Sequence, residues 1–156
     1  MKWTKQDLQQ YIQAKEYVDT IILPLIPFHF STDSSLEKDA FQREVLSVFI
    51  RELEKEITGR ILLCPDYNYL KSADKHNEAK RINSWVDNTR SQPFNHLFFI
   101  TADSSWKKFE QDLKGTLIWL PGIVTESMQV KERQSVIYSQ VQQVSELIRS
   151  YWKDNK

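Results

Sequence analysis

Polar and aromatic side chains follow each of the short apolar runs in this sequence, and they carry groups that could bind a ligand. The candidate binding residues, each chosen because it follows such a run, are His29, Asp33, Asp66, Tyr67, Asp103 and Trp106. If the runs are parallel strands, their carboxyl ends lie at one edge of a sheet, where open α/β sheets bind ligands. The sequence therefore predicts that these six residues share one surface, a shallow aromatic and acidic patch.

A divalent metal site is one chemistry that these residues allow. His29, Asp33 and Asp66 offer one nitrogen and two oxygens, which are donor types that metal ions accept. The spacing between His29 and Asp33 matches no established metal motif, and Asp33 is also placed to cap a following helix. His96 opens an apolar run, so it belongs at the opposite edge of a parallel sheet. With one histidine in reach, we expect neither a bound metal nor another cofactor.

Nucleophilic catalysis by Cys64, the one cysteine, is a second possibility. A reactive thiol needs a positive environment and a base, and His29 would be near if the first two runs form neighbouring strands. Asp66, two residues from Cys64, carries the wrong charge to stabilise a thiolate. Cys64 also ends an apolar run, where cysteine commonly packs as a small hydrophobic residue. We therefore expect Cys64 to be poorly reactive, and we assign no catalytic residue.

Anion binding is a third possibility, because the segments 31–35 and 101–105 both lead into expected helix N-termini. Each segment contains its own aspartate, Asp33 or Asp103, which already occupies the position that favours negative charge. The sequence has only three glycines and contains neither a GxGxxG nor a GxxxxGKS/T motif. Dinucleotide binding and P-loop binding are therefore disfavoured.

Length and charge restrict the class of protein further. With 156 residues, the chain is expected to form a single domain over 1–156. Its 21 basic and 21 acidic residues balance, so no overall charge favours nucleic acid or anionic lipid as a partner. No apolar run approaches the roughly 18 residues of a membrane span, and the start of the sequence lacks a signal-peptide core. Together with the single cysteine, these features predict a cytoplasmic protein without nucleic-acid binding or membrane insertion.

The elements that must position the candidate residues alternate between apolar runs and helical patterns. The runs are 20–23, 61–64, 97–100 and 117–120, and the helical patterns are 5–15, 35–58, 78–89, 106–113 and 129–152. Continuous apolar runs suit strands that are buried on both faces of a parallel sheet. We predict an α/β three-layer sandwich with a mainly parallel sheet of about four strands. A Rossmann-like, a flavodoxin-like and a creatininase-like topology all remain open, because strand order cannot be inferred from the sequence.

Local signals set the expected helix starts. Thr4 and Asp7 form a variant of the capping box for the first helix. Ser34 and Glu37 have the capping-box spacing for the second helix. The polar stretch 66–77 carries no strand or helix signal that we could assign, and it is expected to be a loop.

Packing signals set the expected core and the first strand. Phe49 and Leu53 lie on the apolar face of the second helix and are expected in the core. Pro24 and Pro27 cannot donate hydrogen bonds to a sheet, so the first strand is expected to end near Leu23 or to lie at an edge.

Three segments carry a resemblance to a known family: MKWTKQDLQQYIQAKEYVDTIILPLIPF at the start, and later RILLCPDYNYL and HLFFIT. They resemble the YpiF-like family, catalogued as a domain of unknown function (DUF2487), over nearly the whole chain. The resemblance implies a small cytoplasmic bacterial protein with no assigned activity. It supplies no catalytic residue.

A second resemblance concerns the loop that contains Leu23, Pro24, His29 and Asp33. It is similar to a loop of creatininase-like amidohydrolases, in which a strand ending in Leu-Pro precedes His and Asp metal ligands. The family's glutamate and its glycine-rich His-Gly stretch are absent here, and the loop is shorter. If the architecture is shared, the resemblance implies a metal-dependent amidohydrolase relative with a degenerate site.

Two functional hypotheses follow from the sequence. The leading one is a non-enzymatic binding or interaction module that uses the carboxyl edge of its sheet to bind a protein partner or a small ligand. The alternative is the creatininase-like amidohydrolase relative.

Overall fold

A parallel five-stranded sheet forms the middle layer of the protein, as seen in a computed structural model that describes residues 1–154. The strands are β1 (Thr20–Phe28), β2 (Ile61–Leu63), β3 (Tyr67–Leu70), β4 (His96–Thr101) and β5 (Thr116–Trp119). The order is β2-β1-β4-β5, and β3 also pairs with β1. The predicted α/β sandwich with a mainly parallel sheet is confirmed, and the sheet has five strands instead of about four.

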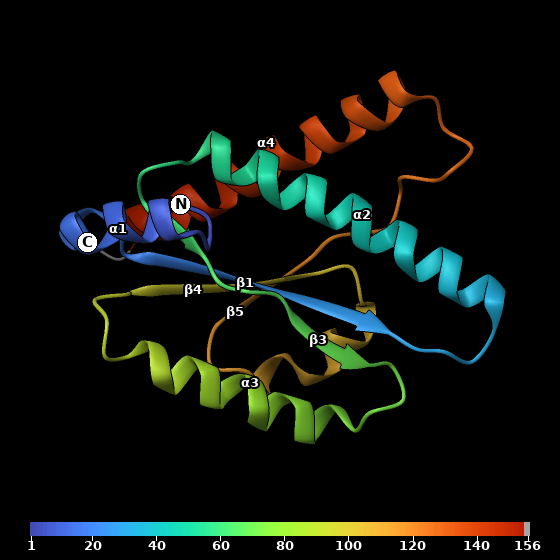
Figure 1. The fold of residues 1–156 in the computed structure, drawn as a ribbon, viewed down its shortest axis with the longest axis horizontal. Helices are drawn as coiled ribbons and strands as arrows, with labels where there is room; N and C mark the ends of the chain where they lie inside the picture. Colours follow the sequence, from blue (N-terminus) through green and yellow to red (C-terminus); the bar gives the residue numbers. More distant parts are fainter. Residues whose placement is uncertain (155–156) are drawn as a thin grey trace.

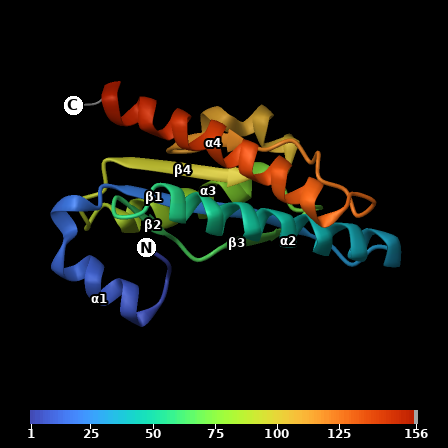
Figure 2. The ribbon, with the colours of Figure 1, turned by 90° about the horizontal axis from the view of Figure 1, so that it is seen from above.

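Helices cover both faces of the sheet (Figure 1). The helical elements are α1 (Lys5–Gln13), η1 (Lys15–Tyr17), α2 (Asp33–Glu56), α3 (Lys75–Thr89), η2 (Ser104–Asp112) and α4 (Val130–Asp154). The elements α2 and α4 lie on one face, and α3 lies on the other with η2, a 3₁₀ helix. Helix α1 projects from the molecule outside these layers (Figure 2).

The strands β2 and β3 are two halves of one interrupted strand. Thr20 of β1 pairs with Ile61, whereas Leu25 of β1 pairs with Tyr67, so the register shifts by one residue between the two halves. One extra residue on the outer strand is the mark of a β-bulge, which here lies within 64–66. If β2 and β3 are counted as one strand, the spatial order is 2-1-3-4. This order corresponds to the first four strands of flavodoxin-like sheets, whose order is 2-1-3-4-5.

The prolines of β1 do not confine it to an edge, and this prediction was wrong. β1 is central, with β2 and β3 on one side and β4 on the other. The Ile22 carbonyl accepts from the Cys64 N–H, so Pro24, two residues on, also faces the outer strand, at its bulge. Pro27 faces the β4 side of β1. The pairing between β1 and β4 ends at Pro24, so no β4 residue lies opposite Pro27 in the ladder. Neither missing N–H therefore removes a bond from the sheet.

Two hydrophobic cores lie above and below the sheet. On the α2 and α4 side, Ile22 and Ile26 of β1 pack with Phe49 and Leu53, which are 1% and 0% exposed. The expectation that Phe49 and Leu53 lie in the core is therefore confirmed. On the α3 side, Leu23 of β1 packs with a separate set that includes residues of β3, α3 and η2. Successive residues of β1 thus serve opposite layers, as both-face burial requires.

Helix starts agree with the sequence in one case and differ in another. Thr4 accepts the N–H of Asp7 at 3.2 Å, as the capping pattern predicts. The second helix begins earlier than predicted, because Thr32, not Ser34, is its N-cap and accepts the N–H of Ser35 at 3.3 Å. Within residues 1–154, no helix has the length and apolar character that crossing a membrane requires.

Candidate functional site

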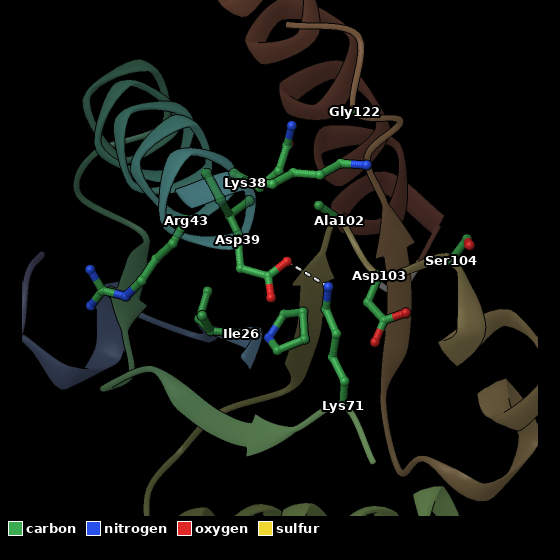
Figure 3. Close-up of a pocket in the computed structure, with 12 residues that line it drawn as sticks. Ile26, Lys38, Asp39, Arg43, Lys71, Ala102, Asp103, Ser104 and Gly122 are labelled. Carbon is green, nitrogen blue, oxygen red and sulfur yellow. Dashed lines mark hydrogen bonds and ion pairs between the residues drawn. The ribbon is translucent and has the colours of Figure 1, made fainter. Parts of the chain in front are cut away.

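A cavity of about 330 Å³ lies at the carboxyl edge of the sheet, and we call it the carboxyl-edge cavity. β1 leads into α2 on one face, whereas the neighbouring β4 leads into η2 on the other, so the chain diverges here. This is the topological switch point, where doubly wound sheets bind ligands. The cavity is lined by Ile26, Pro27, Lys38, Asp39, Gln42, Arg43, Leu46, Lys71, Ala102, Asp103, Ser104 and Gly122 (Figure 3).

The basic side chains of the cavity differ in their partners. Lys71 donates to Asp39 at 2.5 Å, which joins the segment after β3 to α2 (Figure 3). Arg43 points away from Lys71 in the same view and lies 3.6 Å from Asp66. Lys38 forms no ion pair with any residue of the described chain. The cavity therefore contains one basic side chain whose charge is not balanced by a neighbour.

Asp39 is the acidic residue at the centre of this arrangement. Its Oδ1 accepts from Lys71, and its Oδ2 is buried with no hydrogen-bond partner among the described residues. Nδ1 of His29 lies 3.7 Å from Oδ2. His29 does not line the cavity, and it lies beside Asp39, which does.

Asp103 forms the wall on the β4 side and is also the N-cap of η2. Its carboxylate accepts from Ser105, through both N–H (3.0 Å) and Oγ (2.6 Å), and from the hydroxyl of Tyr69 at 2.6 Å. Burial raises the pKa of Asp103, but these hydrogen bonds and Lys75, 3.9 Å away, outweigh it and lower the pKa below its usual value. Asp103 is thus a fixed, ionised wall of the cavity at neutral pH.

The two predicted aromatic residues lie in the core, so the exposed aromatic patch has to be corrected. Tyr67 is 6% exposed and Trp106 is 0% exposed, and both pack below the sheet in the α3 core. The cause is β3, which the sequence analysis treated as a loop. Alternate residues of a strand face one way, and this turns Tyr67 and Tyr69 together into that core. Tyr67 donates to Glu78, and burial together with this bond raises its pKa to about 12.

The remaining predicted residues do not gather around His29. Asp33 is exposed at the first turn of α2. Asp66 lies in a different hollow, lined also by Ile50 and Arg51. Burial raises the pKa of Asp66, and the charge of Arg43 opposes that shift. Among residues 1–154, no group of three His, Cys, Asp or Glu side chains is arranged to hold a metal ion.

The Cys64 thiol lies half-buried at the bulge between β2 and β3. Burial, assisted by the negative charge of Asp66, raises its pKa to about 11. A thiol with that pKa is almost wholly protonated at neutral pH, which disfavours the thiolate that a nucleophilic cysteine needs.

Sequence reasoning did not single out Lys38, Asp39 and Lys71. Lys38 and Asp39 lie on α2, whose charged residues looked like an ordinary solvated helix face. One signal was present, since Asp39, Gln42 and Arg43 are spaced three and four residues apart and must share a face. Leu46 lies on the same face of α2 and is buried, so Asp39, Gln42 and Arg43 lie next to the core.

Comparison with known proteins places the chain among relatives of undefined activity. A family model described as "Protein of unknown function (DUF2487)" matches residues 9–152. The chain is 24% identical over 152 residues to a protein of Bacillus subtilis (strain 168) named "Uncharacterized protein YpiF". The match covers 97% of this chain and 98% of that relative. No solved structure matches the chain.

Proposed function

This chain belongs to the DUF2487 family, whose description assigns no activity, and we propose from its geometry that it is a non-enzymatic module that binds a small anionic molecule. The ligand occupies the carboxyl-edge cavity and presents a carboxylate or phosphate group to Lys38. The observation that carries this proposal is a cavity at the topological switch point with a lysine, Lys38, that has no acidic partner among residues 1–154.

The charges around the cavity support an anion over a cation. Asp39 is already paired with Lys71, and Asp103 is hydrogen-bonded and faces Lys75. Each carboxylate thus has a cation beside it, although Oδ2 of Asp39 accepts no hydrogen bond, whereas among the described residues no carboxylate lies within ion-pair distance of Lys38. An anionic group would supply that partner in a partly enclosed site, where a charge-assisted hydrogen bond is stronger than in water.

The size and lining of the cavity support a small ligand and a binding role. Its volume of about 330 Å³ is at the lower end of the range for small-molecule sites. The described lining residues include neither histidine nor cysteine, the side chains that most often transfer protons or attack substrates at neutral pH. Binding without turnover is therefore the function that we propose.

The test is a titration with inorganic phosphate and, separately, with succinate, at low ionic strength. Amide chemical shifts of Ala102, Ser104 and Gly122 report on the cavity, and we expect saturable changes with at least one of the two anions. The two arms distinguish a phosphate ligand from a carboxylate ligand. If neither anion shifts these amides, the proposal fails.

Three variants sharpen this test. Lys38→Gln should weaken binding about tenfold, since one charged hydrogen bond is lost. Lys80→Gln, at an exposed lysine of α3 on the other face, is the matched control and should bind as the wild type does. Gly122→Val should block binding, because a Cβ there would lie 3.3 Å from Oε1 of Gln42 and narrow the cavity. Equal binding by Lys38→Gln and Lys80→Gln would contradict the proposal.

A further inference from the structure

A second and larger cavity, of about 660 Å³, lies between α1 and α3 beside β2, and we call it the α1–α3 groove. Trp3, Leu8 and Ile12 line it from the α1 side, and Trp85 lines it from α3. It shares no lining residue with the carboxyl-edge cavity. Its volume lies within the range of small-molecule sites.

Large apolar side chains are exposed in the groove. Trp3 is 55% exposed, Ile12 is 64% exposed and Trp85 is 37% exposed, and all three line the same cavity. Single exposed apolar residues are ordinary on a protein surface, whereas a contiguous set beside a cavity marks a site of interaction. Ile12 is carried by α1, which stands outside the main layers (Figure 2).

The floor of the groove is fixed by contacts within the chain. The Tyr11 hydroxyl donates to Gln92 at 2.9 Å, and the Tyr11 ring stacks on Phe94 with ring centroids 5.6 Å apart. Tyr11 and Leu62 are buried beneath the opening. These contacts tie α1 to the segment after α3, so the groove exists before any ligand enters it.

Charge in the groove is confined to one side chain. Among the described lining residues, Lys15 is the one charged group, and its Nζ lies 5.8 Å from the centroid of the Tyr11 ring. The α3 side offers neutral hydrogen-bonding groups, including those of Ser84 and Asn88. The groove therefore combines an apolar wall, a neutral polar wall and a single positive charge.

We propose that the α1–α3 groove binds a small amphipathic monocarboxylate. The apolar body of the ligand lies against Trp3, Ile12 and Trp85, and its carboxylate pairs with Lys15. Burial of the apolar body supplies most of the affinity, because each methylene that leaves water for the groove adds to it. Lys15 selects the sign of the head group, since a cationic head group would be placed beside a like charge.

The test uses decanoate, below its critical micelle concentration, and decylammonium, which has the same chain length and the opposite charge. Tryptophan fluorescence follows binding, because Trp3 and Trp85 line the groove, and calorimetry gives the stoichiometry. We expect decanoate to bind one to one and decylammonium to bind about tenfold more weakly. Absence of saturable decanoate binding, or tighter binding of decylammonium, would overturn the proposal.

Variants of two lining residues, the exposed Ile12 and the partly exposed Lys15, locate the site. Ile12→Ser should weaken decanoate binding at least fivefold, and Tyr138→Ser, at an equally exposed residue of α4, should leave it unchanged. Lys15→Gln should weaken decanoate about fivefold and should remove its advantage over decylammonium. If Ile12→Ser and Tyr138→Ser bind alike, or if Lys15→Gln keeps the preference for decanoate, the groove is not the site.

Discussion

The hydroxyl group of Tyr69 joins the carboxyl-edge cavity to the core below the sheet. It accepts a hydrogen bond from the indole Nε1 of Trp106 at 2.7 Å and donates one to Asp103 at 2.6 Å. Burial of the hydroxyl and the adjacent Asp103 carboxylate raise the pKa of Tyr69, so the group remains a neutral donor over the physiological range. Because Asp103 lines the cavity, this chain of hydrogen bonds fixes one wall of the site.

We predict that Tyr69→Phe lowers the free energy of unfolding by about 1–3 kcal/mol. The substitution leaves the buried Trp106 indole N–H and one Asp103 oxygen without their partner, and unsatisfied buried groups cost about that much. Urea denaturation at neutral pH measures the change. Tyr138→Phe is the control, because Tyr138 is 65% exposed and its variant should differ from wild type by less than about 0.5 kcal/mol. Equal midpoints for both variants would contradict the prediction.

We predict that Cys64 reacts slowly with thiol reagents at neutral pH and that its labelling rate rises with a midpoint near pH 11. Burial and the Asp66 carboxylate raise the pKa to about 11, which disfavours the thiolate that reacts. Labelling rates measured from pH 7 to about one unit above the expected midpoint test this. Asp66→Asn should lower the midpoint, because it removes the negative charge. For the chain unfolded in urea, the midpoint of the labelling rate should return to about pH 8.5, the ordinary pKa of a free cysteine.

The sign of this shift also fixes how Cys64 affects stability. A group whose pKa is higher in the folded state favours folding while it is protonated in both states. Its contribution is therefore complete below about pH 8.5, and it is lost as the pH rises through the folded pKa of about 11.

At the scale of elements, β3 shows which parts of this fold the sequence could reveal. The four apolar runs predicted β1, β2, β4 and β5, because a continuous apolar pattern is typical of strands in a parallel sheet. β3 has the sequence YNYL, in which only Tyr67 and Tyr69 are buried, so its alternation spans just four residues and resembles a polar loop. Because β3 was not recognised as a strand, Tyr67 was predicted at the surface, whereas the strand turns its side chain into the core. Lys38 and Asp39 were not recognised as cavity residues. A charged residue on a helix can be assigned to a cavity only when the positions of the neighbouring loops are known.

We predict that Thr32→Ala destabilises the protein by about 1 kcal/mol, whereas Ser34→Ala changes stability by less than about 0.5 kcal/mol. Thr32 is the N-cap of α2 and accepts the N–H of Ser35, while Ser34 lies inside the first turn. Urea denaturation of the two variants compares them directly. A larger effect at Ser34 would restore the helix start that the capping-box spacing suggests.

The whole molecule is organised around β1, which is paired on both sides and covered on both faces. β1 and β4 contribute to both cores through alternate residues, including Ile22, Leu23, Phe98 and Phe99. Helix α1 instead belongs to a small separate cluster of Tyr11, Val18 and Leu62 with a few partly buried neighbours. Cooperative stability should therefore be highest in the central strands and lowest in α1.

We predict that amide hydrogen exchange in the native protein is slowest in β1 and β4 and fastest, among the helices, in α1. Exchange requires opening, and opening α1 exposes far less apolar surface than opening the central strands does. Hydrogen exchange followed by NMR measures the protection of each amide. Equal protection of α1 and β1 would show that the molecule opens as a single unit. Decanoate in the α1–α3 groove should slow exchange in α1 specifically.

The bulge between β2 and β3 has a consequence for how copies of this chain meet. A long, straight edge strand offers a row of unpaired backbone groups that can add strands from other copies and lead to fibres. Here the outer strand is broken at residues 64–66. Met1 already occupies the outward groups of β2, because its N donates to the Ile61 carbonyl and its carbonyl accepts from Leu63. β2 and β3 are each only a few residues long, so a strand from another copy could form few backbone hydrogen bonds with either of them. This edge therefore resists growth into extended cross-β assemblies.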